Sequence, residues 1–516
     1  MQLLTPPDAR RRVAFVVPRW TAPGEHDVQG TLFRCLPVAG ALYHAGYEVL
    51  FVDQEHDLDR DDRGEELRRH LEGVGLVVFW MNELWPSLQT TNTLQLTLLI
   101  RGWLPGVRVA AGGAFVSLCE PDMLKVDGPV DYFLRGYGEV SVPALARALD
   151  RDPTGATGLD EVPGLVWRAA DGFRHNDSPY QPIGEANNEV MYRLLDLAPA
   201  IQRRGGIFGN EEPTLVVGTG QGCGKRCGFC YWRTHRPSIV GAGSIVRIVE
   251  HLRRTYDVRQ YHLADLDFFM NLARPRELAR LWAERLPDSR WFTLCSPVDA
   301  LKLEADDWAA LQRGGCAKLE FGTETGSPRM IAAIGKRHTP DEVVEITRRA
   351  LDHGIETMHN IIFGFVDETA DDRRRSIDLI ERLHALDPAR VTFAVRMFQP
   401  TPGTPMGEAA LEHIPDFPRT LDEVLAYRPL YGEGGARMMP WLPARDERYL
   451  RKLVTYLVPM ATSNVAVPGA PWRWAYRALR GLAWWRLRAQ TGALNLDEHL
   501  CRRLLEARVF GHTYRP

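Results

Sequence analysis

The chain lacks long apolar runs, a surplus of charge of one sign, and cysteines spaced as a disulfide framework. No apolar stretch in the 516 residues approaches the roughly 20 that span a bilayer, so no membrane span is predicted. Basic and acidic residues number 63 and 66, and this balance argues against nucleic acid or an anionic membrane surface as a partner. The amino-terminal residues show no signal-peptide pattern, and we expect a cytoplasmic protein.

Three of the eight cysteines, Cys223, Cys227 and Cys230, lie close together, and the other five are scattered. In a reducing compartment, clustered thiols indicate a metal site rather than disulfides. Zinc and three incidental buried thiols are the alternatives, but zinc usually takes two separated pairs of ligands, and the chain has no second pair. Three closely spaced thiolates can hold three corners of a [4Fe–4S] cluster and leave one iron open to S-adenosylmethionine (SAM).

Residues 1–155 alternate apolar strands with helices, which predicts an α/β fold with a doubly wound, Rossmann-like parallel sheet. The expected strands are 12–17, 47–53, 75–81, 107–113 and 130–136, and the expected helices are 36–46 and 140–150. Residues 156–205 are rich in Pro, Gly, Asp and Asn. We interpret them as a linker that contains a small hairpin at 165–175.

A second alternating block, residues 206–415, predicts a partial (β/α)6 barrel with its functional groups at the carboxyl ends of the strands. The expected strands are 214–219, 261–265, 291–296, 317–322, 356–364 and 391–397, with helices such as 243–256 and 340–354 between them. Residues 416–516 predict a helical region. Within it, 471–490 carries Trp and Arg at helical spacing, which favours a helix packed on the barrel over a membrane-surface or partner-binding helix.

The motif Cys223-x3-Cys227-x2-Cys230 after the first barrel strand resembles that of the radical SAM superfamily, and the resemblance covers roughly 214–406. Gln221, Gly224 and Val366-Asp367 depart from the residues that are frequent in the family. The resemblance implies a [4Fe–4S] cluster on the three cysteines and SAM contacts by Phe229, Tyr231, Asp265, Glu324 and Ser327, with Lys336 as a further match.

Several of these residues also have a purely structural interpretation. Asp265 or Asp267 could equally cap a helix, and Glu324 could form a salt bridge of the barrel. Cys295 and Cys316 are expected to be inert core thiols, although Cys295 ends a barrel strand, where catalytic groups gather.

The N-terminal block resembles the cobalamin-binding domain that precedes the barrel in one large radical SAM subgroup. The matching segments are 36–42, the Gly112-Gly113 pair, and Gly136-Tyr-Gly-Glu139. The resemblance implies cobalamin contacts by Gly112, Gly113, Gly136 and Glu139, although a glycine pair by itself predicts only a structural turn.

A histidine ligand to cobalt is not predicted, because His26 has the wrong spacing for the known motif. Residues 18–35 or 79–87 would instead face the lower side of the corrin. Trp80 and Trp85 in the second segment are as readily explained by core packing.

The resemblance implies a cobalamin-dependent (class B) radical SAM methyltransferase. Such an enzyme moves a methyl group from methylcobalamin to an unactivated carbon or phosphorus of a small molecule, here expected to be an intermediate of natural-product or antibiotic biosynthesis. It also implies an external one-electron donor of the flavodoxin or ferredoxin type. The alternatives are a radical SAM cyclase or ring-rearranging enzyme, such as a porphyrin-ester cyclase, and a non-catalytic Fe–S and corrinoid binding protein.

Overall fold

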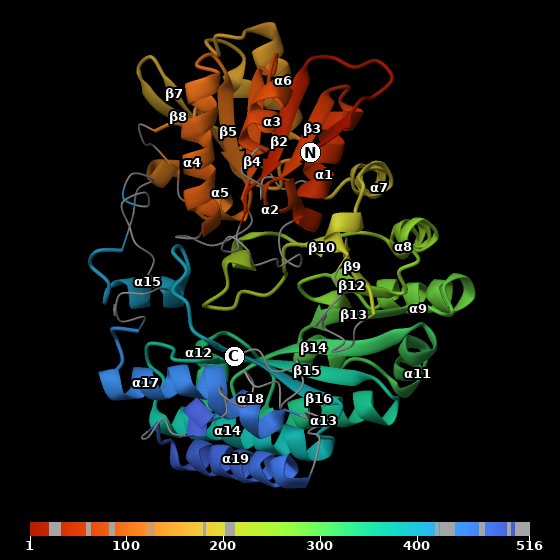
Figure 1. The fold of residues 1–516 in the computed structure, drawn as a ribbon, viewed down its shortest axis with the longest axis vertical. Helices are drawn as coiled ribbons and strands as arrows, with labels where there is room; N and C mark the ends of the chain where they lie inside the picture. Colours follow the sequence, from red (N-terminus) through yellow and green to blue (C-terminus); the bar gives the residue numbers. More distant parts are fainter. Residues whose placement is uncertain are drawn as a thin grey trace.

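The computed structural model stacks three parts along the long axis: an N-terminal sheet, a barrel and a group of C-terminal helices (Figure 1). In the ranges it describes, no helix is both long and apolar enough to cross a membrane. The described residues are 1–19, 32–57, 63–81, 88–119, 121–124, 128–178, 182–201, 212–417, 423, 439–463, 470–492 and 497–500.

The N-terminal sheet has eight strands in the order β1-β3-β2-β4-β5-β6-β7-β8. Its five central strands are parallel, and their order places a topological switch point between β2 and β4. The strands are β1 (Gln2–Leu4), β2 (Arg12–Val17), β3 (Glu48–Asp53), β4 (Leu76–Trp80), β5 (Arg108–Gly112), β6 (Tyr132–Leu134), β7 (Leu165–Ala169) and β8 (Gly172–His175). The helices are α1 (Leu32–His44), α2 (Gln54–Asp57), α3 (Arg63–His70), α4 (Leu88–Trp103), α5 (Ala114–Leu118), α6 (Ser141–Arg151) and α7 (Glu185–Leu194).

Strand β2 shows why this sheet is covered on both faces. Val13 and Phe15 lie in one hydrophobic core, whereas Ala14 and Val16, which alternate with them, lie in the other. Helices α1 and α6 cover the first face, and α3 and α4 cover the second. A strand buried on both faces reads as a continuous apolar run, which is why the doubly wound sheet was predictable.

Two antiparallel additions to the sheet differ from the expectation. Strand β1 pairs with β3 at one edge, and the β7–β8 hairpin pairs with β6 at the other. The hairpin predicted at 165–175 is present as β7–β8, and its pairing with β6 makes it part of the sheet.

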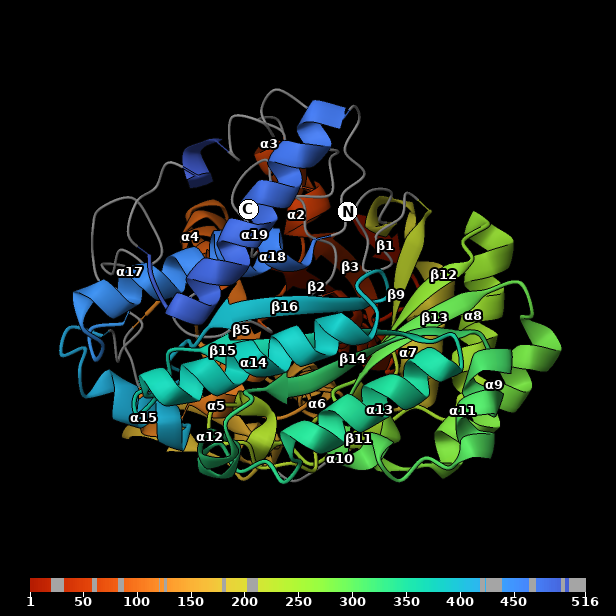
Figure 2. The same ribbon diagram turned by 90° about the horizontal axis from the view of Figure 1, so that it is seen from below.

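The barrel is a six-stranded parallel sheet in the order β16-β15-β14-β13-β12-β9, and the predicted partial barrel is confirmed. Its helices lie on the outer face (Figure 2), and α13 begins with a capping box of Thr339 and Glu342. The strands are β9 (Thr214–Gly218), β12 (Gln260–Ala264), β13 (Arg290–Cys295), β14 (Cys316–Glu324), β15 (Glu356–Phe363) and β16 (Val391–Met397). The helices are α8 (Ala242–Tyr256), α9 (Ala273–Arg285), α10 (Pro297–Ala300), α11 (Ala305–Arg313), α12 (Pro328–Ala333), α13 (Pro340–Asp352), α14 (Ala370–Leu386) and α15 (Pro405–Leu411), and a small β10–β11 ribbon (Gly220–Gln221, Ser238–Ile239) flanks the first strand.

The C-terminal helices pack against the β15–β16 side of the barrel and against α14. They are α17 (Ala444–Lys452), α18 (Val458–Thr462) and α19 (Ala470–Ala489). Tyr476, Leu479 and Leu487 of α19 are buried in a core that also contains Ile377 and Ile380 of α14. The prediction that this Trp- and Arg-rich helix packs on the barrel is confirmed.

Trp80, at the end of β4, occupies space that a glycine leaves open. A Cβ atom added to Gly112 would lie 2.3 Å from Cζ3 of Trp80.

We therefore expect Gly112→Ala to destabilise the protein by about 1–3 kcal/mol through overpacking, measured as a lower thermal or urea midpoint. Gly102→Ala is the control, because nothing lies within 4 Å of its added Cβ and alanine favours the surrounding helix by about 0.5–1 kcal/mol. Equal midpoints for the two variants would contradict this packing.

Candidate active site

The three clustered cysteines lie in the loop that follows the first barrel strand. Cys223, Cys227 and Cys230 line one side of a cavity of about 870 Å³ at the carboxyl ends of the barrel strands. The loop folds back on itself through a hydrogen bond from the backbone N–H of Cys230 to the carbonyl of Cys227 (3.2 Å). Gly222 begins the turn with a φ of 71°, and an added Cβ there would meet Tyr137 and Arg236. The chain thus brings all three thiols to one site.

Burial makes these thiols weak acids in the protein alone. It raises the pKa of Cys223 to about 11 and that of Cys230 to about 12, and it also raises the pKa of Cys227. Binding a metal must therefore displace protons, as is usual for thiolate sites. Two lysines next to the thiols, Lys225 and Lys336, favour the thiolate form.

The arrangement of donors fits a cluster better than a single ion. Across the ranges that the structure describes, no three His, Cys, Asp or Glu side chains are grouped so as to hold one metal ion. Cys295 lines the same cavity from β13, but its Sγ donates to the carbonyl of Glu320 (3.7 Å). Thiols set around one side of a large cavity suit the separate corners of a multi-iron cluster.

Glu324 ends β14 and lines the cavity. Its carboxylate accepts a hydrogen bond from Nζ of Lys336 (2.8 Å), and the same ammonium also donates to the carbonyl of Gly322. Glu324 has a φ of 63°, a conformation that costs a non-glycine residue about 1–3 kcal/mol and is typical of functional sites. Both members of this charge pair line the cavity and act electrostatically on Cys227, whose pKa Lys336 lowers and Glu324 raises.

The structure distinguishes the two aspartates that follow β12. Asp265, the residue predicted to contact SAM, does not line the cavity; it is buried and pairs with Nη2 of Arg274 (2.7 Å). Asp267 does line the cavity, and burial together with the adjacent Asp299 raises its pKa to about 7. Its Oδ1 accepts a hydrogen bond from the backbone N–H of Ser296 (3.0 Å).

Of the two aromatic residues of the cysteine loop that were predicted to contact SAM, one lines the cavity and the other does not. Phe229 lines the cavity and packs on Phe365, with ring centroids 5.9 Å apart. Tyr231 does not line the cavity; its hydroxyl accepts a hydrogen bond from Arg34 of the N-terminal domain (3.0 Å). Trp232, which the motif did not single out, lines the cavity instead.

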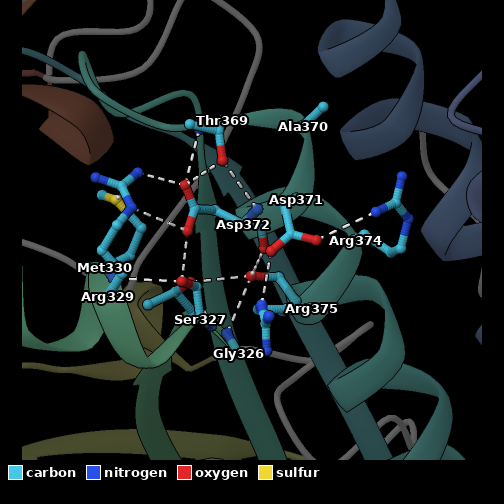
Figure 3. A network of polar contacts seen from close by, with 12 residues as sticks. Gly326, Ser327, Arg329, Met330, Thr369, Ala370, Asp371, Asp372, Arg374 and Arg375 are labelled. Atoms are coloured by element: carbon cyan, nitrogen blue, oxygen red, sulfur yellow. Dashed lines mark hydrogen bonds and ion pairs between the residues drawn. The ribbon is translucent and has the colours of Figure 1, made fainter.

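Ser327 lies outside the cavity in a polar network between α12 and α14 (Figure 3). Its Oγ caps α12 and donates to Oδ1 of Asp372 (2.5 Å). Asp372 also pairs with Arg329 and forms the capping box of α14 with Thr369. A serine followed by Pro328 is a common helix start, so the sequence did carry a signal for this role.

The four residues predicted to contact cobalamin lie at the carboxyl ends of β5 and β6, and none lines the barrel cavity. A Cβ added to Gly112, Gly113 or Gly136 would meet the Trp80 side chain, the Met81 backbone or the Ser178 hydroxyl respectively, so close packing within the protein explains the need for glycine at all three positions. Glu139 accepts hydrogen bonds from the backbone N–H of Gly184 and the amide of Asn187, both 2.8 Å, and burial raises its pKa to about 7.

The alternative of core packing for Trp80 is supported, because its side chain is buried and stacks on Phe15. His26, Trp85, residues 20–31 of the 18–35 segment and 82–87 of the 79–87 segment lie outside the described residues.

The carboxyl edge of the N-terminal sheet faces the cysteine loop. Tyr137, within the Gly136–Glu139 segment, donates a hydrogen bond to the carbonyl of Arg236 just beyond the loop. Arg34 of α1 stacks over Trp232, with its guanidinium carbon 4.7 Å from the ring centroid. Figure 1 shows the same orientation, with α2 and α5 at the lower edge of the upper sheet. The ligand-binding edges of both parallel sheets therefore face each other.

Residues 217–380 match the family model of the radical SAM superfamily. The chain carries a radical SAM domain. The match falls inside the segment that was predicted to resemble this superfamily, and a domain of this kind implies a [4Fe–4S] cluster and SAM.

Among curated relatives, an uncharacterized methyltransferase of Pyrococcus horikoshii is 27% identical over 317 residues, which are 59% of this chain and 63% of that protein. An anaerobic magnesium-protoporphyrin IX monomethyl ester cyclase of Synechocystis is 24% identical over 366 residues, which are 69% of this chain and 68% of that protein. The alignments thus span about two thirds of these relatives.

Two groups of solved structures share the whole architecture. The methyltransferase TsrM of Kitasatospora setae, with tryptophan and a SAM analogue bound, matches with a TM-score of 0.66 at 20% identity and covers 96% of this chain and 100% of its own. The cobalamin-dependent radical enzyme OxsB, with aqua-cobalamin and SAM bound, matches with a TM-score of 0.68 at 12% identity. This match covers 97% of this chain and 76% of the OxsB chain. These matches establish the predicted fold class.

Asp372 should contribute to stability in a pH-dependent way. Burial alone would raise the pKa of Asp372, but Arg329, Ser327 and Thr369 hold it well below its usual range. We expect Asp372→Ala to lower the free energy of unfolding by about 1–3 kcal/mol at pH 7.

A depressed carboxyl pKa adds stability that is complete above the unfolded value of about 3.9 and is lost as the pH falls below it. Denaturant unfolding at several pH values should therefore show the deficit at neutral pH and a smaller one below about pH 4. Asp371→Ala is the matched control, because it removes the exposed carboxylate of the preceding residue. It should lower the free energy of unfolding by less than about 0.5 kcal/mol. A deficit that does not change with pH would contradict the proposed charge.

Proposed function

We propose that this chain is a cobalamin-dependent radical SAM methyltransferase that acts on an unactivated carbon or phosphorus of a small molecule. The observation that carries the proposal is that the carboxyl edge of a doubly wound sheet contacts the cysteine loop of the barrel, through Tyr137 and Arg34. The methyltransferase and cobalamin names among the relatives and structural neighbours support the same assignment.

In this proposal Cys223, Cys227 and Cys230 hold the cluster, and Glu324 with Lys336 binds the amino-acid end of SAM. Phe229, which lines the cavity, would contact the adenine. When bound, the cluster and SAM supply a radical that removes hydrogen from carbon, and the corrinoid supplies the methyl group.

Other residues that line the cavity can exclude water and orient a substrate. Leu294 of β13, Ile362 of β15 and Ala394 of β16 add apolar side chains to the cavity lining, which helps to exclude water from a reactive centre. Asn360 and Glu320, joined by a hydrogen bond of 2.6 Å, add a polar group to that lining and can orient a substrate.

The domain expected at residues 1–155 holds the corrinoid in this proposal. Gly112, Gly113 and Gly136 lie at the carboxyl ends of β5 and β6, the sheet edge at which doubly wound folds bind their ligands. Glu139 accepts hydrogen bonds from Gly184 and Asn187, at the start of α7. The substrate context of natural-product biosynthesis and an external flavodoxin- or ferredoxin-type donor stay predictions.

A cyclase is the second candidate, because two anaerobic porphyrin-ester cyclases align over 69–70% of this chain. The two activities differ in what happens to the methyl group of SAM. A methyltransferase must pass that methyl to the corrinoid, whereas a cyclase needs only reductive cleavage of SAM.

The cluster assignment predicts the behaviour of Cys227→Ala. Anaerobically reconstituted wild type should bind about four irons and form 5′-deoxyadenosine from SAM under reduction. The variant should lose both, because only two thiolates remain, and yet take up as much hydroxocobalamin as wild type. Cys316→Ala, which removes a buried thiol outside the cavity, should keep all three properties. A Cys227→Ala protein with full iron and full SAM cleavage would refute the cluster site.

The methyltransferase assignment can be tested without knowing the substrate. Protein loaded with hydroxocobalamin, reduced and given SAM with a labelled methyl group should form S-adenosylhomocysteine and carry label in its corrinoid fraction. Protein without hydroxocobalamin is the control and should form no S-adenosylhomocysteine. Formation of 5′-deoxyadenosine with no label in the corrinoid would favour the cyclase.

A further inference from the structure

A network of two lysines and two carboxylates lies beside the cysteine loop, apart from the residues assigned to SAM. Nζ of Lys225 donates to Oδ2 of Asp299 (2.5 Å) and lies 3.7 Å from Oδ2 of Asp267. The other oxygen of Asp299 accepts a hydrogen bond from Nζ of Lys302 (2.5 Å). All four side chains line the barrel cavity.

This network holds a positive charge in place within the cysteine motif. Lys225 lies between Cys223 and Cys227 in the chain, and its backbone N–H donates to Sγ of Cys223 (3.4 Å). Asp299 follows β13, and only 2% of its side chain is exposed. The ammonium of Lys225 is therefore tied to a buried carboxylate next to a barrel strand.

A charge held there must act on whatever the thiolates bind. Reduction of an iron–sulfur cluster adds one negative charge, and its potential depends on net charge, hydrogen bonds to sulfur and solvent exposure. A nearby ammonium stabilises the reduced form, and partial burial weakens screening by salt. The backbone hydrogen bond to Sγ of Cys223 acts in the same direction.

We propose that Lys225, positioned by Asp299, raises the reduction potential of the cluster and so sets how readily an electron reaches SAM. The inference rests on the proposed function in one respect, the presence of a cluster on the three cysteines. Lys225 is a positioning and charge-bearing residue here and takes no part in bond making.

The test is an equilibrium redox titration of reconstituted protein, followed by electron paramagnetic resonance, with iron content measured on the same samples. In Lys225→Met the ratio of reduced to oxidised cluster at a fixed potential should fall about tenfold, equivalent to 59 mV for one electron. Asp299→Asn keeps an oxygen acceptor but removes the negative charge, so its potential should move upward. Lys225→Arg keeps the charge and should stay close to wild type.

Lys302→Met is the matched control. Lys302 pairs with the same carboxylate, but 56% of its side chain is exposed to solvent. Its shift should be smaller than that of Lys225→Met. Equal potentials for Lys225→Met and wild type would overturn the inference, and so would a potential for Lys225→Arg as low as that of Lys225→Met. If Lys225→Met holds less iron, Lys225→Gln decides: a downward shift at full iron content supports the inference and no shift overturns it.

Iron content separates this inference from the proposed function. A wild-type protein that binds no cluster overturns both. A wild type with four irons whose potential does not respond to Lys225 overturns only the role of this network.

Discussion

The burial of three thiols at the carboxyl edge of a parallel barrel is the constraint on which the site depends. Burial keeps the sulfurs neutral in the protein alone, so their conversion to metal ligands needs stabilising charge nearby. Lys225 and Lys336 provide it from two sides, and each is tied to a carboxylate at the end of β13 or β14. The loop supplies the sulfur atoms, but the strand ends supply the electrostatics. This division explains why a glycine-rich loop can support a demanding redox site.

The relative placement of the two sheets rests on contacts that local sequence patterns do not reveal. Glu139, from the segment that resembles a cobalamin motif, holds the start of α7, and α7 packs on both α1 and α8. Arg34 and Tyr137 then reach from the N-terminal domain to the cysteine loop and its flank. Residues that resemble ligand contacts in the sequence thus build the interface between the N-terminal sheet and the barrel.

Most of the fold could be predicted from the sequence because its central strands are continuous apolar runs that end at glycine or polar residues. Strand β1 could not, since three residues at a sheet edge carry little pattern, and the membership of the β7–β8 hairpin depends on long-range pairing. That Cys223, Cys227 and Cys230 reach one cavity was predictable, because eight residues of a single loop cannot carry them far apart. Which of Asp265 and Asp267 lines the cavity could not be predicted. Strand β12 ends at Ala264, so its alternation does not extend to either residue, and Asp265 forms an ion pair with Arg274, nine residues further along the chain.

The position of Glu324 shows how the polar network of Figure 3 can serve the site without touching it. A left-handed backbone at a glutamate persists only where its surroundings enforce it. The two residues after Glu324 are held by buried hydrogen bonds: the Oγ atoms of Thr325 and Ser376 lie 2.9 Å apart, and Gly326 donates its N–H to Ser376 (3.0 Å). Ser327 closes the turn by donating to Asp372. The hydrogen bonds of residues 325–327 therefore hold the backbone next to Glu324, whose carboxylate pairs with Lys336.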